Sequence, residues 1–216
     1  MIKNILKTRI KTSIALFILA YLMIVYKFIS TYVLIVFGVL SLIEFFQISN
    51  KIFNKRYLRY FINSVFVIYL SFFCYFFILF SNLIYLKAVL YTVLFGCVAS
   101  DIGGFIFGKI FKGPKLTKIS PNKTYAGAFG SIIFTCITVS LSLFFLTNNF
   151  SYFIIILSVI ISLACQTGDL LFSFLKRKAK IKDTGSFLPG HGGLLDRVDG
   201  ILLGVPLGLI SIILLH

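Results

Sequence analysis

The sequence predicts an all-α, polytopic membrane protein, and three observations lead to this fold class. The chain of 216 residues is 59% hydrophobic and only 12% charged, with a mean hydropathy of +1.04. Its apolar residues gather in seven runs, each close to the roughly 20 residues that a helix needs to cross a bilayer. Its basic residues lie almost entirely between those runs. Because backbone groups inside a bilayer have no water to bond, each run is expected to be a transmembrane helix.

The expected helices follow one another along the whole chain with short connections. They cover about residues 13–29, 31–49, 60–80, 83–102, 126–147, 150–175 and 200–215. We expect a single membrane-embedded domain over 1–216, with N-terminal spans in 1–99 and the site-bearing spans and loops in 100–216. The basic start of the chain imitates a secretion signal. No small-residue cleavage site follows the first apolar run, so this run is expected to remain as a span.

The positions of the basic residues predict the orientation in the membrane. With the N-terminus in the cytoplasm, 19 of the 21 Lys and Arg lie in four cytoplasmic segments: 1–11, 50–59, 103–125 and 176–199. Only Lys27 and Lys87 lie on the other side, both near span ends. Cytoplasmic loops are enriched in Lys and Arg, so we expect a site that faces the cytoplasm. The net charge of +15 then reflects topology and attraction to anionic lipid headgroups, and we expect no nucleic acid partner.

The stretch 165–200 is where the functional site is expected. It holds four of the six acidic residues of the chain: Asp169, Asp183, Asp196 and Asp199. A chain so poor in carboxylates that gathers most of them in one stretch is expected to assemble a site there. The four cysteines lie inside apolar runs without the paired spacing of a zinc site, and we expect no role for them in the chemistry.

On the sixth expected helix, Asp169, Ser173 and Lys176 follow one another at i, i+4 and i+7 and therefore share one face. A polar stripe on a lipid-embedded helix must face protein or water. Asp169 is therefore expected in a cavity. The alternative is that Asp169 is a buried structural residue that forms an ion pair with Lys176.

Asp196 and Asp199 are three residues apart, just before the last expected span. With Asp169 they form a candidate site for Mg²⁺, which prefers oxygen ligands and completes its shell with water and phosphate oxygens. Lys and Arg residues lie close to these carboxylates in the sequence. A metal between carboxylates and phosphates is the arrangement used for phosphoryl or nucleotidyl transfer.

The first long loop, about 100–127, opens with Asp101 at the end of the fourth expected span. An ionisable group at that depth is unfavourable and usually functional; an Asp at the membrane interface is the alternative. Gly104 and Gly108 have the spacing that lets two helices approach closely.

Farther along this loop, Ser120 and Pro121 have the pattern of a helix N-cap and first helical residue. Lys123 would oppose the dipole of that helix. This makes sense if Lys123, Thr124 and the free amides bind an anion there. A solvated lysine that only marks topology is the alternative.

The second long loop, 176–195, begins with five cations in seven residues, which would attract an anionic lipid or a nucleotide. Positive-inside bias explains the same run equally well. In the glycine-rich turn 189–193, His191 is a candidate proton carrier or phosphate donor, and a histidine that only stabilises the loop is the alternative.

These residues resemble the signature of the phosphatidate cytidylyltransferases, the CDP-diacylglycerol synthases. The run SFLKRKAKIKDTGSFLPGHGGLLDRVD, residues 173–199, matches that signature nearly position for position. Shorter blocks resemble the same family at 100–101, 119–124 and 168–170. The resemblance covers the second half of the chain, from Ser100 to Leu215, and the first half matches only in being apolar.

The resemblance implies that CTP and phosphatidic acid react to give CDP-diacylglycerol and pyrophosphate. It implies Mg²⁺ as cofactor, with a monovalent cation such as K⁺ as a second candidate, on Asp169, Asp196 and Asp199. The implied catalytic residues are Asp169, Lys176, Asp183, His191, Asp196 and Asp199. The implied substrate-binding residues are Asp101, Ser120, Asn122, Lys123, Thr124, Ser173, Arg177, Lys182 and Arg197. We expect an enzyme of the bacterial inner membrane, with a homodimer left open.

Two positions depart from the family pattern. The family usually has Glu where this chain has Phe172, and Trp-Glu where it has Tyr125 and Ala126. If either glutamate tunes metal or substrate binding, turnover here would be weaker. The alternative functions are a CTP-dependent transferase acting on another lipid phosphate and a non-enzymatic anion transporter.

Overall fold

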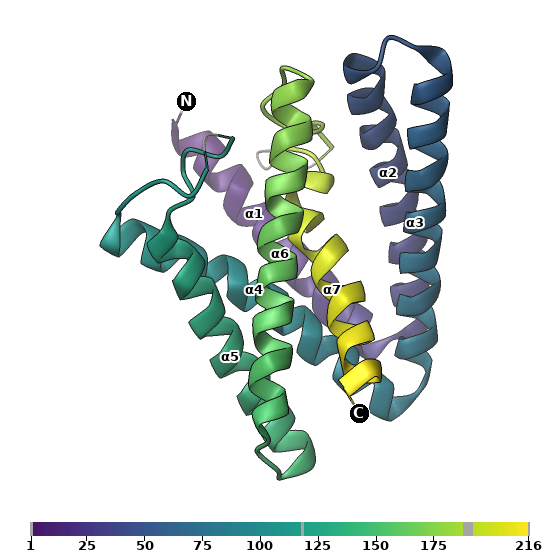
Figure 1. The fold of residues 1–216 in the computed structure, drawn as a ribbon. Helices are drawn as coiled ribbons and strands as arrows, with labels where there is room; N and C mark the ends of the chain where they lie inside the picture. The colour runs from purple at the N-terminus through teal and green to yellow at the C-terminus, as the bar shows by residue number, and fades with distance from the viewer. Residues whose placement is uncertain (1, 118, 188–191, 216) are drawn as a thin grey trace. The chain divides into compact units, whose positions relative to one another are not determined.

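The structure, a computed structural model, describes residues 2–117, 119–187 and 192–215. Within them the chain folds into seven α-helices (Figure 1). They are α1 (Ile2–Val25), α2 (Lys27–Ile52), α3 (Arg56–Asn82), α4 (Ile84–Phe111), α5 (Tyr125–Thr147), α6 (Tyr152–Lys178) and α7 (Leu195–Leu215). The predicted all-α class is confirmed.

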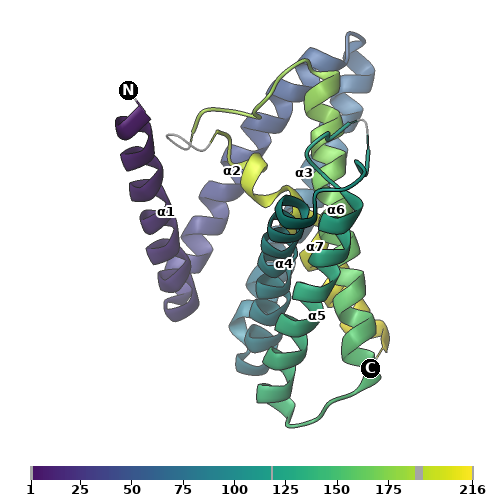
Figure 2. The same cartoon turned by 90° about the vertical axis from the view of Figure 1, so that its left-hand side faces the viewer.

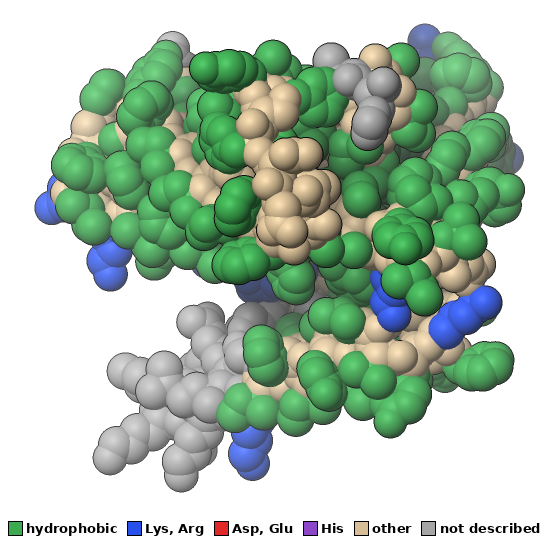
Figure 3. Space-filling model, turned by 90° about the horizontal axis from the view of Figure 1, so that it is seen from below, with side chains coloured by type: hydrophobic (Ala, Val, Ile, Leu, Met, Phe, Trp, Pro, Cys, Tyr) green, Lys and Arg blue, Asp and Glu red, His purple; other side chains and the backbone are tan. Residues whose placement is uncertain are grey.

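Six of these helices, α2 to α7, are long and apolar enough to cross a membrane, whereas the apolar part of α1 is the shorter segment Ile14–Val25. The first expected span, 13–29, is wrong in its end, because Tyr26 has an extended backbone (φ −108°, ψ 114°) and α2 begins at Lys27. Large apolar side chains are widely exposed, for example Phe28 at 89%. Figure 3 shows one face that hydrophobic side chains dominate, with no Asp or Glu in view among the described residues. Such a surface suits contact with lipid.

The predicted boundaries are also wrong at three places around the site. Helix α4 continues to Phe111, past the expected end at 102, and α7 starts at Leu195, so Asp196 lies in its first turn. Helix α5 starts at Tyr125, and its N-cap is Thr124 rather than Ser120. Ser120 and Pro121 belong instead to a turn in which the Lys123 amide donates to the Ser120 carbonyl at 3.1 Å.

The chain divides into two compact units. The first comprises residues 1–82 and 175–197, and the second comprises residues 83–174 and 198–216. In the first unit α2 and α3 lie side by side (Figure 1), with the Phe45 and Phe66 rings stacked at 3.7 Å between centroids. Figure 2 shows α1 joined to α2 by a tight connection from which the two helices diverge.

The second unit is a bundle of α4, α5 and most of α6 and α7, in which α4 and α5 pack most extensively. Glycines allow this contact, because a Cβ added to Gly103 would lie 2.5 Å from the Gly130 carbonyl oxygen. Buried Ser131 donates to the Ser100 carbonyl at 2.7 Å. Small residues and interhelical hydrogen bonds of this kind replace the hydrophobic effect as the packing force between helices in lipid. This interface explains why α4 continues past its expected end.

The N-cap of α5 gives a first prediction. The Thr124 hydroxyl accepts from the Gly127 amide at 3.1 Å, so Thr124→Ala should destabilise the protein by about 1 kcal/mol and lower Tm by roughly 2–4 °C. Thr124→Ser keeps the acceptor and serves as the matched control. Thermal unfolding in detergent, followed by size-exclusion chromatography, measures both variants. Equal losses in the two would contradict a capping role.

Candidate active site

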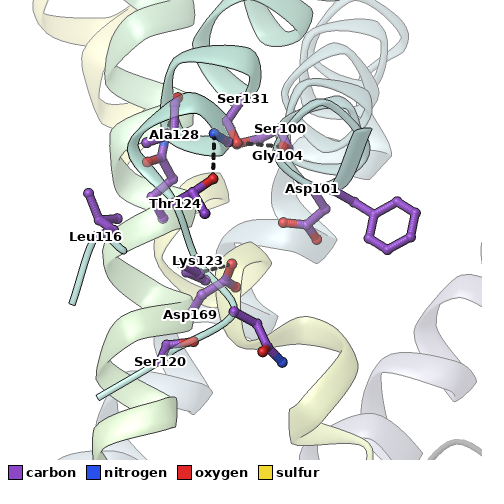
Figure 4. A pocket seen from close by; sticks show the side chains of 14 residues that line it. Ser100, Asp101, Gly104, Leu116, Ser120, Lys123, Thr124, Ala128, Ser131 and Asp169 are labelled. Carbon is purple, nitrogen blue, oxygen red and sulfur yellow. Dashed lines mark hydrogen bonds and ion pairs between the residues drawn. The ribbon is translucent and has the colours of Figure 1, made fainter. Parts of the chain in front are cut away.

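A cavity of about 340 Å³ in the second unit gathers the polar residues of the first loop and of α6 (Figure 4). It is lined from α4 by Ser100, Asp101, Gly104 and Phe105, from the loop by Leu116, Ser120, Asn122, Lys123 and Thr124, from α5 by Gly127, Ala128 and Ser131, and from α6 by Gln166 and Asp169. Six residues predicted from the sequence therefore line one cavity: Asp101, Ser120, Asn122, Lys123, Thr124 and Asp169.

An ion pair lies at the centre of this cavity. Lys123 Nζ donates to Asp169 Oδ2 at 2.7 Å, and the two side chains are 28% and 17% exposed. The alternative that Asp169 pairs with Lys176 is wrong. Lys123 directly precedes the N-cap of α5, so the Asp169 carboxylate supplies the anion expected near that helix N-terminus.

Backbone hydrogen bonds fix the loop that carries Lys123. The Leu116 amide donates to the Lys123 carbonyl at 2.7 Å, and the Tyr125 amide donates to the Pro114 carbonyl at 3.2 Å. These bonds, with the isolated bridge between Lys115 and Thr124, hold the segments 114–117 and 119–125 against each other. The Lys123 side chain is thereby held over α6.

The base of the cavity is a polar network between three helices. Gln166 Nε2 donates to the Ala128 carbonyl and to Ser162 Oγ, both at 3.2 Å. The hydroxyls of Ser162 and Ser100 lie 3.2 Å apart. Buried groups bonded to one another in this way are fixed in place, so the network holds the helices beneath Asp101 and Asp169.

Asp199 reaches the same region because α6 and α7 approach closely through two glycines. A Cβ on Gly168 would lie 2.5 Å from the Asp199 carbonyl oxygen, and a Cβ on Gly200 would lie 2.8 Å from Asp169 Oδ1. The Asp199 carboxylate accepts from the Gly200 amide at 3.1 Å. The backbone of Asp199 and Gly200 therefore packs against the Asp169 carboxylate.

The donors in this region are oxygen atoms of carboxylates, hydroxyls and amides, which suit Mg²⁺. Among the described residues no group of three or more His, Cys, Asp or Glu could hold a metal ion by itself.

Asp196 belongs to the first unit, where protein donors engage both its oxygens. Lys176 Nζ donates to Oδ1 at 2.7 Å. The amides of Thr184 and Gly193 donate to Oδ2 at 2.8 and 3.1 Å. Asp196 thus anchors both ends of the loop 183–194, and its predicted metal ligation stays a prediction.

Glu44 is a buried acidic residue of the first unit that was not predicted from the sequence. It lies on α2, is 0% exposed, and accepts hydrogen bonds from Thr184 Oγ1 and from the amides of Leu194 and Leu195. The available signal was an ionisable residue in the middle of an apolar run, which is expensive in a membrane and usually functional.

The remaining predicted residues are not brought into the cavity. Arg177, Lys182, Asp183 and Arg197 are exposed residues of the first unit, and Ser173 is half-buried on α6 outside the cavity lining. His191 lies outside the described residues. Of the two departures from the family pattern, Phe172 is 4% exposed and Ala126 is half-buried in the first turn of α5.

The known proteins that this chain resembles include several with the same name. Proteins named phosphatidate cytidylyltransferase match at 42% identity over 113 residues in Mycobacterium leprae (52% of this chain, 36% of that protein), at 40% over 124 residues in Rickettsia felis (53% and 55%) and at 43% over 108 residues in Helicobacter pylori (50% and 40%). The matches thus span about half or less of the length of these curated relatives. The model of the Cytidylyltransferase family matches residues 5–215. Because that match covers nearly the whole chain, the protein belongs to the cytidylyltransferase family.

Proposed function

We propose that this protein is a phosphatidate cytidylyltransferase, which converts CTP and phosphatidic acid into CDP-diacylglycerol and pyrophosphate. The observation that carries the proposal is the Lys123–Asp169 pair in a polar cavity at the N-terminus of α5, with Asp101 on the same cavity wall. The names of the relatives and the family match support the choice of substrates. Six apolar helices fit an enzyme whose acceptor is a membrane lipid.

In the proposed reaction, an oxygen of the lipid phosphate attacks the α-phosphorus of CTP. A new P–O bond forms there, and the bond from the α-phosphorus to the oxygen that bridges to the β-phosphate breaks. Pyrophosphate leaves with the electron pair of that bond, so no atom is oxidised or reduced. Such a transfer depends mainly on positioning and on offsetting negative charge.

The residues of the cavity supply both requirements. Lys123 and the N-terminus of α5 offer positive charge to a phosphate group, and Ser120, Asn122 and Thr124 offer polar contacts beside it. Asp169 orients the Lys123 ammonium group through the 2.7 Å contact. We propose that Asp169 and Asp199 hold Mg²⁺, which would neutralise phosphate charge when bound.

We further propose that this site faces the cytoplasm from the inner membrane, as CTP requires. The distribution of Lys and Arg supports this orientation, since the loop before α5 and the segment after α6 are two of the four segments that hold most of the basic residues. Exposed Arg177 and Lys182 would attract anionic lipid at the same surface.

An activity assay tests the proposed function. Purified protein in lipid vesicles with phosphatidic acid, radiolabelled CTP and Mg²⁺ should form labelled CDP-diacylglycerol and release one pyrophosphate for each product molecule. Diacylglycerol, which lacks the phosphate nucleophile, is the matched control lipid and should give no product. Absence of product with phosphatidic acid would overturn the proposal. Product from a polyprenyl phosphate alone would reassign the acceptor.

A further inference from the structure

The buried carboxylate of Glu44 accepts hydrogen bonds from both ends of the loop 183–194. Its Oε2 accepts from Thr184 Oγ1 at 2.7 Å and from the Leu195 amide at 2.9 Å, and its Oε1 accepts from the Leu194 amide at 2.8 Å. The partners lie 140 to 151 residues away in sequence. Helix α2 therefore ties down a segment from the far end of the chain.

The loop has glycine at the two positions where its backbone lies closest to the Glu44 carboxylate. A Cβ on Gly185 would lie 2.6 Å from Glu44 Oε1, and a Cβ on Gly193 would lie 2.7 Å from Glu44 Oε2. Two glycines thus let the backbone of both loop ends lie directly against the Glu44 side chain. Any larger residue would push the loop away from α2.

Thr184 links Glu44 to Asp196. Its hydroxyl lies 2.7 Å from Glu44 Oε2 and 3.1 Å from Asp196 Oδ2. A hydroxyl has one proton to donate, and the shorter distance assigns it to Glu44. The Thr184 amide donates to Asp196 at 2.8 Å, so one residue binds both carboxylates.

Nearby groups compensate the two negative charges separately. Lys176 balances Asp196 at 2.7 Å, whereas Glu44 lies at the N-terminus of α7, whose first amides point toward it. A helix N-terminus stabilises an anion through its free amides and its dipole. Glu44 thereby acts as a cap for α7 that comes from another helix.

We propose that Glu44 is a positioning residue for cytidylyl transfer. By fixing the first turn of α7, it sets the place of Asp196, which lies in that turn and which the sequence predicts to take part in the reaction. This inference rests on the proposed function. Glu44 acts through the residues that donate hydrogen bonds to it, Thr184, Leu194 and Leu195.

The test uses two variants and one matched control. Glu44→Gln keeps the side-chain shape but replaces one acceptor oxygen with an NH₂ group that faces a donor. Thr184→Val removes a single hydroxyl and serves if Glu44→Gln fails to insert. Ser41→Ala changes another residue of the buried α2 face, one whose hydroxyl has no hydrogen-bond partner among the described residues.

In Glu44→Gln, kcat is expected to fall about 10- to 100-fold, the size of loss that small misplacements cause, while KM for CTP changes less than about threefold. Hydrogen exchange should quicken in the peptides 183–187 and 192–197 and stay unchanged at 119–125. Thr184→Val should show the same pattern more weakly, and Ser41→Ala should match the wild type in every readout.

The outcomes separate this inference from the function on which it rests. Normal kcat in Glu44→Gln with faster exchange would make Glu44 a structural cap only and overturn the positioning role. Unchanged exchange would overturn the anchoring itself. A wild-type protein without transferase activity that still shows the exchange difference would overturn the proposed function and leave the anchoring in place.

Discussion

Asp169→Asn is expected to lower kcat/KM for CDP-diacylglycerol formation by roughly 100- to 1,000-fold, the range found when one preorganised charged or polar group is removed from an active site. Asparagine keeps the shape but removes the charge that orients Lys123 and that would hold Mg²⁺. Lys123 Nζ, which lies 2.7 Å from Asp169 Oδ2, would lose this charged partner. Turnover of radiolabelled CTP by purified protein measures the effect.

The control is Thr167→Val on the same helix, because Thr167 is exposed and its hydroxyl donates to the Ala164 carbonyl of its own helix. A second variant separates stability from catalysis. Asp169→Asn leaves Lys123 without its counter-ion, so adding Lys123→Gln should recover lost thermal stability without recovering turnover. Near-normal turnover in Asp169→Asn would show that the cavity is not the reaction site.

Gly168→Ala, which adds a single methyl group, is expected to lower both stability and turnover. The new Cβ would lie 2.5 Å from the Asp199 carbonyl oxygen and 3.2 Å from Gly200 Cα. Both atoms belong to backbone, which cannot rotate aside as a side chain can, so the start of α7 must shift away from Asp169. Overpacking of this kind costs about 1–3 kcal/mol, and the displaced Asp199 should reduce kcat about 100-fold.

Gly38→Ala on α2 is the matched substitution. Its Cβ would meet only Cys74 Sγ at 3.7 Å, an ordinary contact, and alanine favours a helix over glycine by about 0.5–1 kcal/mol. Gly38→Ala should therefore keep or raise Tm and keep full activity. Wild-type Tm and turnover in Gly168→Ala would mean that α6 and α7 do not touch at this glycine.

Hydropathy predicted the helices because a bilayer restricts the chain to apolar helical segments. Hydropathy did not predict where α4 ends, and the local sequence did not decide which residue caps α5. Residues 102–111 remain helical because the α4 glycines pack on α5, and packing between helices leaves no hydropathy signal. Ser120 carries the N-cap pattern as well as Thr124 does, and only the turn at Pro121 and Asn122 decides between them.

Six of the fifteen predicted site residues line one cavity, and the sequence did not predict how they pair. Asp101, Lys123 and Asp169 lie in one cavity as their residue types suggested. The partner of Asp169 lies 46 residues away, and no helical periodicity links the two. Glu44 lies outside the stretch 165–200, which holds most of the carboxylates, although a single acid in an apolar run is the stronger membrane signal.

The long separation between Glu44 and its partners has a consequence for biogenesis. The ribosome makes Glu44 about 140 residues before Thr184 and 151 residues before Leu195. Until then α2 holds an acidic group with none of these donors, and such a group stays hydrated or takes up a proton. The contacts of Glu44 with this loop can therefore form only after residues 184–195 have been made, and a product truncated before α7 should be recognised by membrane quality-control proteases.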